Sequence, residues 1–182
     1  MKAVRFHETG GPEVLRYEDV PAPAPADGQV RIRVAGVAYN PADGGMRGGF
    51  LPILIALPHT PGYDVAGTVD ALGGGVDDLE IGDSVIGLIP MEADGAAAEY
   101  VVAPAAVLVK APLTIPLADA AGPPSGALTA APAPFEAASL RGGARGGIQG
   151  AGGPVRGSCV QPPRRSRAHR DATAGVATRQ RC

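Results

Sequence analysis

A cluster of glycines in the second half of the chain could bind a phosphate group. Gly150, Gly152 and Gly153 lie in the segment GIQGAGG. A glycine-rich turn lets backbone amides approach a pyrophosphate, and in dinucleotide-binding domains it stands between a strand and a helix. Pro154 then removes one amide at the start of the expected helix, although a first helical turn tolerates proline. The segment therefore predicts a phosphate-binding turn followed by a helix.

The cysteines and histidines do not predict a metal site. The two cysteines, Cys159 and Cys182, lie close to the end of the sequence, and a disulfide between them is unexpected in a reducing compartment. The three histidines, His7, His59 and His169, are scattered and lack the spacing of metal ligands. We assign neither cysteine a role, and zinc catalysis is not expected.

The sequence predicts two strands joined by an acidic turn in the first half of the chain, and these strands would position any site residues there. Residues 65–71 alternate so that a twisted strand can present one largely apolar face. Three glycines, 73–75, end this strand in a flexible turn. The pair Gly82-Asp83 then signals a second strand over residues 85–88. Any small β-barrel could use this pattern.

The order of the motifs is more specific than any one of them. The chain opens with MKAVRFHETGGPEVLRYEDV, continues with PHTPGYDVAGTVDALGGGVDDLEIGDSVIGL, and then reads ADGAAAEYVVAPAAVLVKAP. This order resembles the medium-chain dehydrogenase/reductase superfamily, and within it the zinc-free quinone-reductase branch, over about the first 120 residues. The resemblance implies a GroES-like β-barrel on the substrate side of a cleft, followed by a Rossmann domain that should bind NADPH.

The expected fold class is α+β dominated by β, with a GroES-like β-barrel followed by an incomplete Rossmann (α/β) segment. We expect the barrel over residues 1–115, the start of the NAD(P)-binding Rossmann domain over 116–157, and a disordered Arg- and Pro-rich tail over 158–182. A length of 182 residues fits one full domain and part of another. We therefore interpret the chain as truncated relative to its family.

The strands of the barrel, and the helices around it, can be placed approximately. Strands are expected near residues 2–6, 13–19, 29–37, 62–72, 83–89, 98–103 and 107–110. We expect a short helix or turn after Pro41, a helix at PLADAAG, and an irregular or broken helix to about residue 139.

The second half departs from the family pattern. Pro123, Pro124, Pro132 and Pro134 fall where a continuous helix should run. An interior proline costs about 3 kcal/mol, because it removes a donor and clashes with the preceding turn. In the next expected strand, ARGGIQGAGG, glycines replace the apolar residues that would pack between helical layers.

Charge divides the chain at the same place. Residues 1–122 carry 7 Lys and Arg against 16 Asp and Glu, whereas residues 123–182 carry 9 Arg against 2 acidic residues. Substitution of apolar residues by Pro, Gly and Arg is what short, compensating reading-frame slips in a GC-rich gene would produce. We state this as a hypothesis, which clean DNA traces across the region would refute.

The resemblance also implies site residues. Asn40 in YNPAD matches an Asn that lines the cleft near the nicotinamide, and its alternative role is a turn residue before Pro41. Tyr63 and Asp64 occupy the loop-to-strand junction where zinc-dependent relatives place a ligand and its neighbouring acid, so both are expected to face the cleft. A structural hydrogen bond is the alternative for Asp64. Thr129 in GALTA matches a Thr that touches the nicotinamide, with a plain helix residue as the alternative.

These assignments form two sets, and neither includes a metal ligand. The zinc-ligand His of the relatives falls at Tyr63 and their later Cys falls near Ser125. Arg47 in MRGG matches a basic residue near the cleft, but we expect it to be a solvated charge. The catalytic candidates are Asn40, Tyr63 and Asp64, and the cofactor-binding candidates are Asn40, Thr129, Gly150, Gly152 and Gly153.

The function that the resemblance implies is hydride transfer from NADPH to a quinone or an activated double bond. NADH is the alternative cofactor. Without a Lewis acid, such a reaction depends on positioning and on donors that stabilise the developing oxyanion. We expect this activity to be impaired in the truncated chain. The alternative function is a non-catalytic GroES-like barrel that acts as a small-molecule-binding or subunit-interaction module.

The expected partners are limited to a small quinone or enone substrate. The basic segment PPRRSRAHR has no interleaved aromatic residue for base stacking, so we do not expect nucleic-acid binding. No apolar stretch of about 18 residues is present and the N-terminus lacks the apolar core of a signal peptide, which predicts a cytoplasmic protein without membrane contact. Loss of the family's dimer interface is also expected, because relatives pair their Rossmann sheets.

Overall fold

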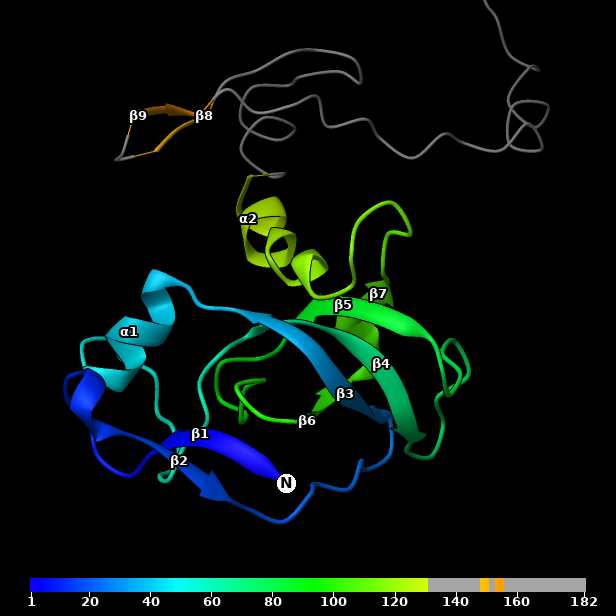
Figure 1. Ribbon diagram of the computed structural model, residues 1–182, viewed down its shortest axis with the longest axis horizontal. Helices are drawn as coiled ribbons and strands as arrows, with labels where there is room; N and C mark the ends of the chain where they lie inside the picture. Colours follow the sequence, from blue (N-terminus) through cyan, green and yellow to red (C-terminus); the bar gives the residue numbers. More distant parts are fainter. Residues whose placement is uncertain (131–147, 151–152, 156–182) are drawn as a thin grey trace, which may run out of the picture. The chain divides into compact units, whose positions relative to one another are not determined.

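The computed structural model describes residues 1–130, 148–150 and 153–155. The chain divides into two units, Met1–Thr129 and Ala130–Cys182, and each is described by itself. The first unit is built mainly from antiparallel strands, with a few short helices beside them (Figure 1). Within the described ranges, no helix has the length and apolar character that crossing a membrane requires.

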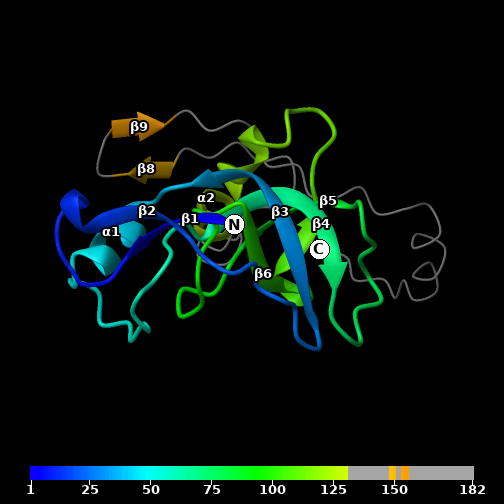
Figure 2. The ribbon, with the colours of Figure 1, turned by 60° about the horizontal axis from the view of Figure 1, so that its bottom comes forward.

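A five-stranded antiparallel sheet forms most of the first unit. Its strands, in spatial order, are β6 (Tyr100–Pro104), β3 (Gln29–Ala38), β4 (Asp64–Leu72), β5 (Ser84–Leu88) and β7 (Leu108–Lys110). The register between β3 and β4 shifts between Arg31 and Ile32 and again between Val34 and Gly36. Such bulges bend a strand and increase its twist. The long strands β3 and β4 are correspondingly curved in Figure 2.

A second, two-stranded sheet pairs β1 (Lys2–Phe6) with β2 (Leu15–Asp19). Isolated bridges, Ala3 to Ala98 and Phe6 to His59, connect it to the segments around the large sheet. The inward-facing side chains of the strands then share one core, which includes Val30, Ile32, Val65, Val69, Val85 and Val101. Complete burial of such a side chain contributes about 1.5–3 kcal/mol to folding, so this core holds the sheet closed.

Three helical segments flank the large sheet. Helix α1 (Pro41–Arg47) follows β3, and a 3₁₀ helix (Asp119–Ala121) precedes helix α2 (Pro123–Ala130). Ala120 and Ala121 are buried against Ala66 of β4. The backbone of Ala118 lies against Gly36 of β3, where a side-chain Cβ would come within 2.8 Å of the Ala118 Cα atom. This approach docks the segment before α2 directly on the sheet.

The predicted strands are all present in the first unit, with different limits at some ends. The strand expected from residue 62 begins at Asp64, because Gly62 has a φ of +93° and cannot be extended. The strand expected from residue 13 begins at Leu15, because Pro12–Val14 forms a 3₁₀ helix with proline in its first turn. The helix expected at PLADAAG is confirmed only as the short 3₁₀ segment.

The expectation that prolines break the next helix needs a correction at its start. Pro123 and Pro124 form the first turn of α2, where the missing N–H groups would have no helical acceptor. They therefore begin the helix and do not interrupt it. Pro132 and Pro134 lie outside the described residues.

The described part of the second unit is a hairpin. Strand β8 (Ile148–Gly150) pairs with β9 (Gly153–Val155), so that Gly150 faces Gly153 and Gln149 faces Pro154. The sequence predicted a helix after the glycines, and the structure places a strand there. Glycine is a weak helix former, which removes the local preference that would start one. Gly152, the predicted tail 158–182, and the two cysteines lie outside the described residues.

Candidate active site at the start of strand β4

Asp64 is the centre of the candidate site, because its carboxylate joins three segments of the chain. It is the first residue of β4 and is completely buried. Its Oδ2 atom accepts a hydrogen bond of 2.8 Å from the side-chain Nδ2 of Asn40, at the start of α1. Its Oδ1 atom accepts one of 2.8 Å from the backbone N–H of Ser125, in the first turn of α2. The structure therefore brings two of the predicted catalytic residues, Asn40 and Asp64, into direct contact.

The local sequence explains why Asn40 lies at this position. It is the residue before α1, with Pro41 in the first helical turn, where a fixed φ and a missing N–H suit the helix start. Asn40 is half-buried and its backbone is extended. The residue before a proline prefers extended backbone, so the Asn-Pro pair sets the direction in which the Asn40 side chain points.

Burial raises the pKa of Asp64 above its ordinary value of 3.8. The hydrogen bonds from Asn40 and Ser125 oppose this effect because they stabilise the carboxylate, whereas the nearby charge of Asp43 adds to it. The folded protein thus holds the proton of Asp64 more tightly than the unfolded chain does. The stability that this proton provides is complete below the ordinary pKa, and is lost as the pH rises through the folded pKa.

This direction predicts the effect of Asp64→Asn. The amide cannot ionise, so the free energy of unfolding of the variant, relative to the wild type, should increase as the pH is raised from about 3.8. The amide oxygen that the substitution introduces can still accept from Ser125, and the Asn40 amide can turn to present its oxygen. Urea unfolding followed by circular dichroism between about pH 3 and 7 measures the difference.

Asp83→Asn provides the matched control for this experiment. The pKa of Asp83 is lowered, first by the backbone N–H of Glu80 and then by Lys110. Its carboxylate therefore stabilises the fold above the ordinary pKa, and the stability of Asp83→Asn relative to wild type should fall as the pH rises. If the free energy of unfolding relative to wild type changed with pH in the same direction for both variants, the assignment of a raised pKa to Asp64 would be contradicted.

The side chain of Tyr63 does not face a cleft, contrary to expectation. It is 1% exposed and packs in the barrel core. Its hydroxyl lies 2.7 Å from Nε2 of the buried His59 and donates a 2.8 Å hydrogen bond to the sulfur of Met46. Burial raises the pKa of Tyr63, and burial lowers the pKa of His59, so both groups favour their neutral forms. Successive residues of a chain point to opposite sides, which separates Tyr63 from Asp64.

The remaining predicted residues are placed apart from the Asn40–Asp64 pair. Thr129 is exposed on α2, beyond Ser125. Gly150 and Gly153 belong to the hairpin of the second unit. Arg47 is not the solvated charge that was expected: it is half-buried, and its Nη1 atom donates a 2.8 Å hydrogen bond to the carbonyl oxygen of Gly10.

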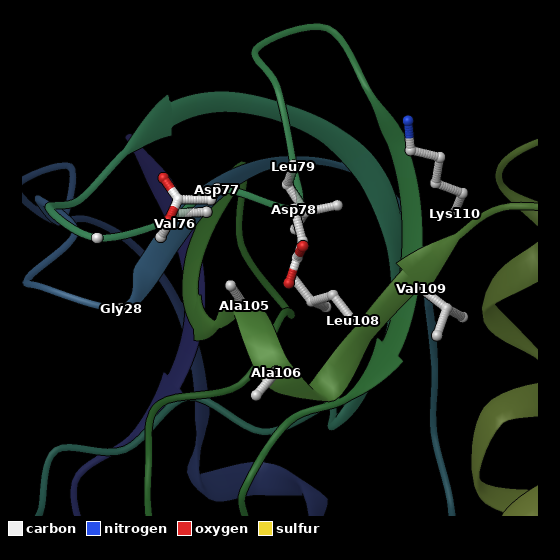
Figure 3. A pocket seen from close by; sticks show the side chains of 11 residues that line it. Gly28, Val76, Asp77, Asp78, Leu79, Ala105, Ala106, Leu108, Val109 and Lys110 are labelled. Carbon is white, nitrogen blue, oxygen red and sulfur yellow. The ribbon is translucent and has the colours of Figure 1, made fainter.

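A pocket of 540 Å³ lies elsewhere in the first unit and contains none of the predicted site residues (Figure 3). It is lined by the turn that follows β4, residues 75–79, and by residues 105–106 and 108–110 around the start of β7, together with Gly28. Asp77 and Asp78 are exposed, so water already solvates the acidic groups at this pocket. The candidate site is instead the pair of the half-buried Asn40 and the buried Asp64, which are joined by a hydrogen bond.

The donors near Asp64 do not form a metal centre. In the described part of the chain, no group of three His, Cys, Asp or Glu side chains could hold a metal ion. At the position where zinc-dependent relatives place a His, the neutral Tyr63 hydroxyl is committed to His59 and Met46. A buried neutral phenol is a poor zinc ligand, and the residues present therefore do not fit zinc.

Sequence reasoning missed the role of Asp43 in this site. The carboxylate of Asp43 is buried and accepts hydrogen bonds from the backbone of Asn40 and of Gly62. Part of the signal was present, because an acidic residue three positions after a helix N-cap is typical of a capping box. The contact with Gly62 spans 19 residues and is not visible in the local pattern.

Comparison with known proteins agrees with this architecture. Residues 26–113 match the family described as the alcohol dehydrogenase GroES-like domain. The rat protein named quinone oxidoreductase is 45% identical over 86 residues, which cover 47% of this chain and 26% of the relative. An Arabidopsis thaliana protein named chloroplast envelope quinone oxidoreductase homolog is 32% identical over 184 residues, which cover 97% of this chain and 56% of the relative.

Solved structures extend the similarity to three dimensions. The mycobacterial protein Rv1454c, solved in complex with NADPH, has a TM-score of 0.70 and 35% identity, with 79% of this chain and 43% of that chain covered. The chain therefore spans about half, or less, of the length of the relatives that it matches. The barrel, the motif order and these similarities show that the chain belongs to the medium-chain dehydrogenase/reductase superfamily, in its zinc-free quinone oxidoreductase-like branch.

Proposed function

We propose that this chain carries the substrate-side domain of an NADPH-dependent, zinc-free reductase of quinones or enones. The observation that carries the proposal is the hydrogen bond from the half-buried Asn40 to the buried Asp64, in a barrel similar to that of quinone oxidoreductases. In such a reaction, NADPH when bound supplies a hydride, and the acceptor gains that hydride and a proton to give a hydroquinone or a saturated ketone.

The residues of this chain would act on the acceptor by hydrogen bonding. Asp64 accepts one N–H of the Asn40 amide, which fixes the direction of that amide. A fixed amide can donate its other N–H to a quinone or enone oxygen, where negative charge develops during reduction. Asp64 is fully buried, so it acts as the support of Asn40 and does not touch the acceptor. The Tyr63 hydroxyl is also buried, so its role is to support the core through His59 and Met46, and it does not touch the acceptor.

The described residues do not form a complete dinucleotide site. Asn40 and Thr129 are in the first unit, while Gly150 and Gly153 pair in a hairpin that lacks the helix start needed to present amides to a pyrophosphate. We therefore propose weak cofactor use by this chain, with NADPH preferred to NADH. A cytoplasmic location, a small quinone or enone as partner, no nucleic-acid or membrane partner, and loss of the family dimer interface are further parts of the proposal.

The division of the chain is also part of this proposal. The barrel domain over 1–115, the partial Rossmann domain over 116–157 and the tail over 158–182 follow the family organisation. The first compact unit extends to Thr129, because Ala120, Ala121 and Ser125 contact the sheet. The linker between the two domains would then be anchored on the barrel by these contacts.

Consumption of NADPH in the presence of a benzoquinone tests the proposal. The chain should show weak quinone-dependent turnover, and Asn40→Ala should lower it about tenfold, as expected for the loss of one hydrogen bond. Lys110→Ala, in the distant pocket, should leave turnover unchanged. Binding of the quinone without any NADPH consumption would contradict the reductase function, and would favour the non-catalytic binding module.

A further inference from the structure

Asp43 has a buried carboxylate whose two oxygen atoms both accept backbone hydrogen bonds. The residue is 1% exposed and belongs to the first turn of α1. Its Oδ2 atom accepts a 2.7 Å hydrogen bond from the N–H of Asn40, and its Oδ1 atom accepts a 2.7 Å hydrogen bond from the N–H of Gly62. A carboxylate is suited to this role because it can only accept, so neither N–H meets another donor.

The two backbone groups belong to the two segments that carry the candidate site. Asn40 bears the amide itself, and Gly62 lies two residues before Asp64. Gly62 has a φ of +93°, and its carbonyl oxygen accepts a 2.6 Å hydrogen bond from the N–H of Ala96. The Cβ of a larger residue at Gly62 would lie 2.5 Å from the Val37 side chain. The chain that leads into Asp64 is therefore fixed on both sides, and Asp43 provides one of these attachments.

Helix capping alone does not account for the second of these hydrogen bonds. A capping box requires only that the side chain three residues after the N-cap accepts from the N-cap N–H, which is the contact with Asn40. The contact with Gly62 contributes nothing to the helix, which is only seven residues long. It does set the distance between the start of α1 and the start of β4, across which Asn40 reaches Asp64.

We propose that Asp43 is the positioning residue that holds the Asn40 amide on Asp64, and this inference rests on the proposed role of that pair in reduction. Its carboxylate acts through the backbone of Asn40 and of Gly62 and does not touch the acceptor. Loss of the Gly62 contact changes the separation of the two segments, and loss of the Asn40 contact frees the residue that bears the amide. The Asn40 amide then loses its fixed direction, even where the barrel remains folded.

NMR of the isotope-labelled chain, without NADPH or quinone, tests this proposal. The side-chain amide of Asn40, assigned by its disappearance in Asn40→Ala, should give two well-separated proton resonances in the wild type. Asp43→Asn places an amide N–H against one backbone N–H, and the two resonances should shift toward those of a solvent-exposed amide. A reductase assay fails or succeeds independently of this readout, so the two proposals can be distinguished.

Asp94→Asn is the matched control. The Oδ1 atom of Asp94 accepts a 2.8 Å hydrogen bond from the backbone N–H of Thr60, close to Gly62, but Asp94 makes no contact with Asn40. This variant removes a carboxylate charge next to the same segment but keeps an oxygen that can accept from Thr60, so it should leave the Asn40 amide resonances in place. Where Asp43→Asn does not fold, Asp43→Glu and Asp94→Glu form the corresponding pair. An unshifted Asn40 signal in the Asp43 variant, or an equal shift in the Asp94 variant, would overturn the proposal.

Discussion

Tyr63→Ala should lower the free energy of unfolding by about 3–5 kcal/mol, the range for removal of a large buried aromatic side chain. Tyr63 is 1% exposed, so truncation leaves a cavity among neighbours that cannot fully close it. It also leaves the ring nitrogen of the buried His59 without the hydroxyl that lies 2.7 Å from it. An unpaired buried polar group adds to the loss. Urea unfolding followed by far-UV circular dichroism measures the change.

Tyr63→Phe separates the two contributions. It keeps the ring, removes the hydroxyl, and should cost about 1–3 kcal/mol through the unpaired His59 nitrogen. Tyr17→Ala is the control, because Tyr17 is 71% exposed and its removal should change stability by no more than about 0.5 kcal/mol. If Tyr63→Phe kept full stability but lost quinone-dependent turnover, the hydroxyl would be catalytic and the supporting role assigned to it would be wrong.

The strands could be predicted from the sequence because their information is local. Alternation over residues 65–71 and 85–88, with glycines in the turns between them, is enough to place β4 and β5. The limits of the strands depend on single residues and are less visible. Gly62 was included in a strand, although its positive φ is required where the carbonyl oxygen turns toward Ala96.

The candidate site could be predicted only in part. The motif order indicated Asn40 and Asp64, but their contact joins positions 24 residues apart and depends on how α1 packs against β4. Tyr63 was expected to face the cleft with Asp64, because the two occupy the junction where zinc-dependent relatives place a ligand and its neighbouring acid. Consecutive side chains entering a strand point to opposite sides, which sends Tyr63 into the core.

The prolines show how position within an element outweighs composition. Pro123 and Pro124 were expected to break a helix, and in the structure they start one. The cost of about 3 kcal/mol applies to a helix interior, where an N–H bond is lost. In the first turn that bond does not exist, so the same residues fix the backbone for the helix at little cost. Their placement also directs the Ser125 N–H toward Asp64.

Gly36→Val should separate the segment 117–125 from the sheet and lower the free energy of unfolding by about 1–3 kcal/mol, as overpacking does. The Cβ atom would overlap the backbone of Ala118, which cannot move aside as a flexible side chain can. The displacement should also withdraw the Ser125 N–H from Asp64. Water then reaches the carboxylate, and the burial that raises the pKa of Asp64 is reduced. Loss of the Ser125 hydrogen bond acts in the opposite direction, but burial is the larger of the two effects, so the pKa should fall.

Two measurements and one control distinguish this effect from general destabilisation. Urea unfolding gives the loss of stability, and NMR of the Asp64 carboxyl carbon gives its pKa in the folded variant. Ala35→Val is the control, because Ala35 is exposed on the same strand and its extra methyl groups should change both quantities little. An unchanged pKa of Asp64 in Gly36→Val would show that the 117–125 segment does not shield the site. A fall toward 3.8 would show that docking of this segment keeps water from the Asn40–Asp64 pair.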